Sequence, residues 1–121
     1  MILVDTSVWV DHFRQGNARL VQFLNDNDVI CHPMVIGELA CGHIKDRKEV
    51  LNLLQALPMV QQVEDDEILQ FIENRKLMGK GLGYIDMHLL ASTVLDDIFF
   101  WTLDKPLRKV AQGLNIEVEL K

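Results

Sequence analysis

Short apolar runs alternate along the chain with segments in which apolar residues recur at helical intervals. Apolar runs rich in β-branched or aromatic residues predict buried strands at 2–4, 29–31 and 98–102, and a weaker strand at 59–63. An alternation of apolar and polar residues predicts an edge strand at 116–120. The helical intervals predict helices over about 7–15, 18–24, 34–40, 47–57, 68–78, 84–95 and 106–112.

Strands separated by helices predict an α/β fold, here a three-layer α/β/α sandwich around a mostly parallel central sheet. The chain has 121 residues, which is enough for one hydrophobic core and too few for two. We therefore expect a single domain over 1–121. Sheets of this kind bind ligands beyond the carboxyl ends of their strands, at the point where the strand order reverses.

The composition is that of an ordinary folded chain. Hydrophobic residues make up 49% and charged residues 25%, so a disordered chain is not expected. The longest uncharged apolar runs have the length of strands, and no membrane span is predicted. The segment 1–5 reaches an acid at once and lacks the basic start of a signal peptide. Cys31 and Cys41 form no C-x-x-C pair, and a reduced, cytoplasmic protein is the simplest interpretation.

The charge balance narrows the ways in which this chain could bind nucleic acid. Twelve Lys and Arg against eighteen Asp and Glu leave a net charge of −6, which disfavours a basic patch as the main attachment. Net charge describes the average field of a protein and not the field at one site. Acids that hold a divalent cation no longer repel a phosphate, so the acidic total disfavours a passive binder more than a metal-dependent nuclease.

Four acidic residues stand where the ends of elements should meet. Asp5 follows the first strand and Asp104 follows the strand at 98–102, so both are expected at the carboxyl edge of the sheet. Glu38 lies in an otherwise apolar helix, where a charge is costly to bury unless it is paired or bound to a metal. Asp86 lies in the first turn of its helix. A cluster of such acids must hold protons or a cation, and an all-oxygen ligand set suits Mg²⁺ or Mn²⁺.

Each acid also has a purely structural interpretation. Asp5 could cap the helix that follows it, and Asp104 could open the turn before Pro106. The four histidines form no metal-binding pattern. The glycine-rich loop at 79–83 lacks the spacing of a nucleotide-binding loop. It could instead lead into Asp86 and bring Lys80 to RNA phosphates.

Four short motifs together resemble the PIN domain. They are Asp5-Thr6-Ser7 after the first strand, Glu38 in a Glu-Leu-Ala helix, Gly-Tyr-Ile-Asp86 at a helix start and Thr102-Leu103-Asp104 after a strand. The four acids follow one another at intervals of 33, 48 and 18 residues. The chain length and the Asp-Lys-Pro-Leu segment at 104–107 are most similar to the VapC toxins of bacterial toxin–antitoxin pairs.

This resemblance implies a Mg²⁺-dependent endoribonuclease of α/β fold, with Mn²⁺ as the alternative cation. Asp5, Glu38, Asp86 and Asp104 would form its catalytic and metal-binding set, with Asp5 and Asp86 as direct ligands. The hydroxyl of Thr6 would support Asp5, or only cap the helix. The resemblance also implies an RNA substrate, a homodimer and a cognate antitoxin whose arginine pairs with the carboxylates.

Two other functions compete with a nuclease. A phosphoryl-receiver domain has this size and fold class, but it needs paired acids after the first strand and an Asp at the end of the third. Asp5 stands alone, and the stretch 53–63 holds no Asp, so this alternative is poor. A non-catalytic RNA- or protein-binding module of the same fold remains as the main alternative. The intact set of four acids argues against it, and a divalent-metal titration distinguishes the two.

Overall fold

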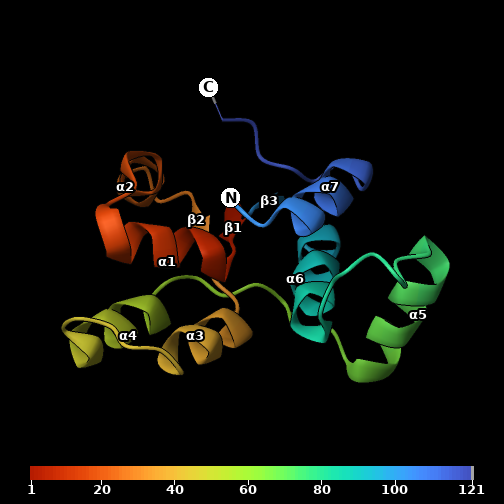
Figure 1. Cartoon of the computed structure of the whole chain (residues 1–121), viewed down its shortest axis with the longest axis horizontal. Helices are drawn as coiled ribbons and strands as arrows, with labels where there is room; N and C mark the ends of the chain where they lie inside the picture. The colour runs from red at the N-terminus through yellow and green to blue at the C-terminus, as the bar shows by residue number, and fades with distance from the viewer. Residues whose placement is uncertain (121) are drawn as a thin grey trace.

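A short parallel sheet forms the centre of the computed structural model, which describes residues 1–120. Its strands are β1 (Ile2–Val4), β2 (Val29–Ile30) and β3 (Phe99–Trp101), in the order β2-β1-β3 (Figure 1). Both pairings of β1 are parallel. Parallel strands covered on both faces read as unbroken apolar runs, which is why these segments are visible in the sequence.

Helices form the connections between the strands within residues 1–120. Figure 1 shows α1 to α4 on one side of the strands and α5 to α7 on the other, so the predicted α/β/α sandwich is confirmed. The helices are α1 (Thr6–Gln15), α2 (Ala18–Asn25), α3 (Pro33–Ala40), α4 (Arg47–Gln55), α5 (Asp65–Arg75), α6 (Tyr84–Leu95) and α7 (Lys105–Gly113).

The strand order reverses between β1 and β3. From β1 the chain passes through α1 and α2 to β2 on one side, and then returns past β1 to β3 on the other. The last residues of β1 and β3, Val4 and Trp101, are partners in the register. The backbone N–H of Asp5 donates to the carbonyl of Trp101 at 2.9 Å. The residues that follow both strands therefore begin side by side, where this fold class binds its ligands.

Two of the strands predicted from the sequence are wrong. The segment 59–63 forms only an isolated bridge between Met59 and Cys31. The pairing cannot continue because the segment that contains Cys31 turns into α3 at Pro33. The segment 116–120 forms only an isolated bridge between Glu117 and Phe100. Its alternation is nevertheless real, because Ile116 and Val118 are both buried.

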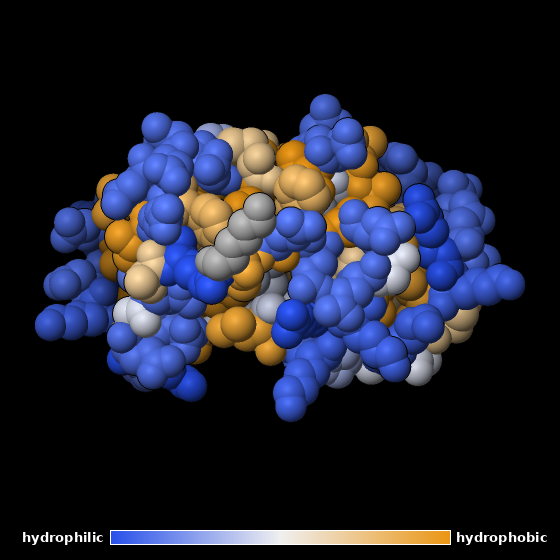
Figure 2. Space-filling view, turned by 90° about the horizontal axis from the view of Figure 1, so that it is seen from above, coloured by the Kyte–Doolittle hydropathy of each residue, from blue (hydrophilic) through white to orange (hydrophobic). Residues whose placement is uncertain are grey.

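The core packs the sheet against the helices on both sides. The largest fully buried side chains include Leu3 and Phe100 from the sheet, Leu20 from α2 and Leu89 from α6. The surface is mostly hydrophilic, but hydrophobic patches interrupt it on the face shown in Figure 2. No helix within residues 1–120 has the length and apolar character needed to cross a membrane.

Phe99 and Phe100 provide a matched test of the core. Phe100 is fully buried, whereas Phe99 on the opposite face of the same strand is 51% exposed. We expect Phe100→Ala to lower the free energy of unfolding by about 3–5 kcal/mol, through lost apolar burial and the cavity left behind. Phe99→Ala should change it by less than about 1 kcal/mol. Urea denaturation measures both, and equal losses would contradict this assignment of the core.

A buried histidine predicts how stability depends on pH. His32 is fully buried, and its Nδ1 accepts a hydrogen bond from the Met34 N–H at the start of α3. Burial, with a smaller effect of the charge of His88, lowers the pKa of His32 to about 4. The unfolded chain takes up this proton near pH 6.5, before the folded protein does. Stability should therefore be complete above about pH 6.5 and fall by up to about 3 kcal/mol as the pH drops toward 4.

The variant His32→Asn should remove most of this pH dependence. Asparagine can still accept the hydrogen bond at the helix start, but it does not titrate. His43→Asn is the control, because His43 is exposed. Urea unfolding at pH 6.5, 5.5 and 4.5 measures the slope. If the stability of the wild type falls no more between pH 6.5 and pH 4.5 than that of His32→Asn, the proposed role of His32 is refuted.

Candidate active site

Asp5 is a buried carboxylate held by two hydroxyl groups. Its side chain is only 5% exposed, and its Oδ2 accepts hydrogen bonds from Ser7 Oγ and from Thr102 Oγ1, each at 2.7 Å. Asp5 occupies the position before α1, but its side chain makes no capping hydrogen bond. The interpretation of Asp5 as a helix cap is therefore wrong. Its carboxylate links the start of α1 to the end of β3, and the two donors offset the cost of burying it.

The same hydroxyls also hold the connection between β3 and α7. Thr102 Oγ1 accepts from the Asp104 N–H at 3.1 Å, and Ser7 Oγ accepts from the Leu103 N–H at 3.0 Å. Asp104 in turn caps α7, since its Oδ2 accepts from the Leu107 N–H at 3.0 Å. The sequence predicted that Asp104 opens a turn before Pro106; in the structure it instead caps α7, which begins at Lys105. This capping uses one carboxylate oxygen.

Asp86 lies in the first turn of α6, as predicted. Its Oδ2 accepts from the Gly83 N–H at 2.9 Å, which fixes the carboxylate against the start of its own helix. Partial burial raises the pKa of Asp86, the Gly83 hydrogen bond opposes this, and the negative charges of Asp5 and Asp104 raise the pKa further. Asp5 and Asp104 therefore both lie close enough to Asp86 for their charges to act on its carboxylate.

Glu38 lies on α3, at the edge of the candidate site. Its Oε1 accepts a hydrogen bond of 2.7 Å from Thr6 Oγ1, one residue after Asp5. The prediction that Thr6 supports Asp5 is therefore wrong, because its hydroxyl points to Glu38 instead. Glu38 is also exposed and not buried, so the argument from the cost of a buried charge does not apply to it. It lines a cavity of about 300 Å³ that Arg14 and Lys45 also line.

The four carboxylates fit a divalent cation by their chemistry, although they do not form a compact metal-binding group. Within residues 1–120, no three His, Cys, Asp or Glu side chains are placed to hold a metal ion. The described hydrogen bonds engage one carboxylate oxygen of each of the four acids. Within residues 1–120, the second oxygen of each accepts no side-chain or backbone hydrogen bond. Oxygen-only donors of this kind suit Mg²⁺ and Mn²⁺.

Sequence reasoning missed Ser7 and Thr102 as parts of the site. Both belong to the Asp-Thr-Ser and Thr-Leu-Asp motifs, but neither was given a role at the site. In the structure their hydroxyls donate to Asp5. The available signal was position, since Thr102 directly follows β3 and Ser7 lies two residues after Asp5 in the first turn of α1. Hydrogen-bonded partners of this kind orient metal-binding carboxylates in many sites.

Comparison with known proteins assigns the chain to a family. The family model for the PIN domain matches residues 2–113, a range that contains all four acids. The chain is also 50% identical over 109 residues to Ribonuclease VapC32 of Mycobacterium tuberculosis, in the strains CDC 1551 / Oshkosh and ATCC 25618 / H37Rv. The alignment covers 89% of this chain and 88% of the relative. The chain belongs to the PIN domain family.

Proposed function

We propose that this protein is an endoribonuclease that depends on a divalent cation and serves as the toxin of a toxin–antitoxin pair. The observation that carries the proposal is that Asp5 and Asp104 follow β1 and β3 at the strand reversal, where their charges act on Asp86. The substrate class comes from the relative, which is named a ribonuclease and shares half of its aligned residues with this chain.

In this proposal Asp5 and Asp86 hold the cation, Mg²⁺ or Mn²⁺, and Glu38 and Asp104 border it. When bound, a divalent cation offsets the negative charge of a phosphodiester and makes water a better nucleophile. Burial, and to a smaller degree the charges of Asp5 and Asp104, raise the pKa of Asp86, and a bound cation would offset the part that is due to those charges. The side chains thus contribute negative charge and fixed geometry.

The nucleophile in this proposal is water and not a side chain. Three hydroxyls lie at the site: Thr6 donates to Glu38, and Ser7 and Thr102 donate to Asp5. A carboxylate is too weak a base to make a hydroxyl nucleophilic in the way that a histidine does. Water attacks phosphorus while the bond to the 3′-oxygen breaks. The products are a 5′-phosphate and a 3′-hydroxyl end.

The proposal includes a cognate antitoxin, a homodimer and a cytoplasmic location. An antitoxin arginine would pair with the free carboxylate oxygens through a two-pronged hydrogen bond, which matches guanidinium geometry.

RNA cleavage by purified protein, free of any antitoxin, tests the proposed activity. Wild-type protein should cut total RNA in Mg²⁺ and stop in EDTA. Asp86→Asn should reduce the rate by about 100-fold or more, because it removes one negative ligand and leaves the others in place. Asp97→Asn is the matched control, since this exposed residue follows the same helix in a left-handed conformation (φ 52°) that asparagine also adopts.

Three outcomes of this experiment can be told apart. Cleavage by wild type and Asp97→Asn alone supports the nuclease and the site together. Equal cleavage by Asp86→Asn would mean that the wrong acids were chosen. A wild-type protein that binds Mg²⁺ or Mn²⁺ weakly or not at all, and cuts nothing, would favour the non-catalytic binding module.

Thr102→Val tests whether the hydroxyl orients Asp5. The variant keeps the shape of the side chain and loses the hydrogen bond to Oδ2, so the cation should bind about 10–100-fold more weakly. Titration with Mn²⁺ measures the affinity, and raised Mg²⁺ should restore part of the activity. Thr93→Val is the control, because Thr93 is also buried but bonds only to the Leu89 carbonyl within α6. Equal effects of the two changes would indicate a general loss of packing.

A further inference from the structure

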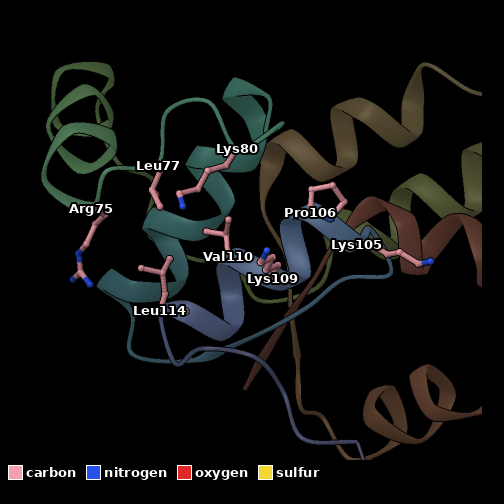
Figure 3. Close-up of a pocket in the computed structure, with 9 residues that line it drawn as sticks. Arg75, Leu77, Lys80, Lys105, Pro106, Lys109, Val110 and Leu114 are labelled. Carbon is pink, nitrogen blue, oxygen red and sulfur yellow. The ribbon is translucent and has the colours of Figure 1, made fainter.

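A cationic pocket lies between the end of α5, the loop that follows it, and α7. Its volume is about 690 Å³. Figure 3 shows Arg75 at one end and Lys105 at the other, with Lys80 and Lys109 between them beside Val110. Leu77 and Leu114 complete an apolar floor with Val110. The pocket therefore combines positive charges at its rim with an apolar base.

This pocket is positively charged, although the chain as a whole is negatively charged. The protein has a net charge of −6, yet four of its twelve Lys and Arg residues line this one pocket, and no Asp or Glu does. None of the four cations forms an ion pair with any part of the chain from 1 to 120. All four are exposed, so their charges remain available to an anionic ligand.

The pocket adjoins the candidate active site through two elements. Lys105 directly follows Asp104, which places their Cα atoms about 3.8 Å apart. Lys80 lies in the loop that leads to Gly83, the residue whose N–H holds Asp86. A chain of phosphates with one member at the carboxylates would therefore pass Lys105 as it leaves the site.

We propose that this pocket binds the backbone phosphates of single-stranded RNA next to the bond that is cut. This inference rests on the proposed function and names the path of its substrate. Ribose and base faces would lie on the floor of Leu77, Val110 and Leu114. No aromatic side chain lines the pocket to stack on bases. Recognition here is thus mainly electrostatic and tolerant of sequence.

RNA is favoured over an acidic protein segment for a structural reason. The cations lie along the pocket from Lys105 to Arg75 beside an apolar floor (Figure 3). This arrangement suits a polymer that has a charge on every unit and an uncharged face between the charges. An acidic peptide is the alternative occupant. A decaglutamate peptide tests it in the same assay.

The test is binding of a fluorescent single-stranded RNA of mixed sequence, measured by anisotropy in EDTA on the Asp86→Asn background. The double variant Lys80→Glu/Lys109→Glu should weaken binding at least tenfold. The slope of log affinity against log salt should fall by about 0.7 for each phosphate that the variant no longer neutralises. A second variant, Lys80→Gln/Lys109→Gln, should show a smaller loss in the same direction. The control Arg19→Glu/Lys48→Glu makes the same change of net charge at exposed residues of α2 and α4.

Each outcome decides for or against the pocket. Weaker binding by the pocket variants and not by the control supports it. Four results would each overturn it. The pocket variants could bind RNA as well as the Asp86→Asn protein does, or the control could lose as much affinity as they do. The Asp86→Asn protein could fail to bind RNA, or it could bind decaglutamate more tightly than RNA. Cleavage of total RNA by wild-type protein in Mg²⁺ is scored separately. The protein could therefore bind RNA through the pocket and fail as a nuclease, or cut RNA without using the pocket.

Discussion

The hydrogen bond from Thr102 to Asp5 is the interaction on which the candidate site depends. It joins the ends of β1 and β3 at the point where the strand order reverses. A carboxylate that is 5% exposed needs donors, and the fold supplies Thr102 from one strand end and Ser7 from the helix that follows the other. The need to satisfy one buried charge thereby sets the position of the whole β3–α7 connection, including Asp104.

The sequence predicted the architecture well where a segment is decided by its own residues. The strands at 2–4, 29–31 and 98–102 are visible because β1 is buried on both faces and β2 and β3 are buried or partly buried over most of their length, which favours unbroken apolar runs. The segments 59–63 and 116–120 were misjudged because the length of a ladder depends on the partner as much as on the segment. Each segment pairs with the sheet at one position only, Met59 with Cys31 and Glu117 with Phe100.

In the candidate site too, the features that depend on nearby residues could be predicted, and those that depend on tertiary packing could not. Asp5, Asp86 and Asp104 could be placed at one edge because each follows directly from an element boundary. The partners of Thr6 and Ser7 could not, because adjacent residues in the first turn of a helix point in directions about 100° apart. Thr6 therefore meets Glu38 on α3, while Ser7 meets Asp5 and Thr102. The exposure of Glu38 likewise depends on how α3 packs against its neighbours.

Asp86 in the first turn of α6 and Asp104 just before α7 each use one oxygen to cap the start of the helix. Asparagine offers the same capping oxygen and carries no charge. A single exchange of this kind would leave both helices anchored and remove a repulsive charge from the site. At these two positions the fold is therefore not tied to the acids by stability, whereas the buried carboxylate of Asp5 links the ends of β1 and β3. A lineage that exchanged Asp86 and Asp104 for asparagine could lose these charges and keep the domain as a binding scaffold.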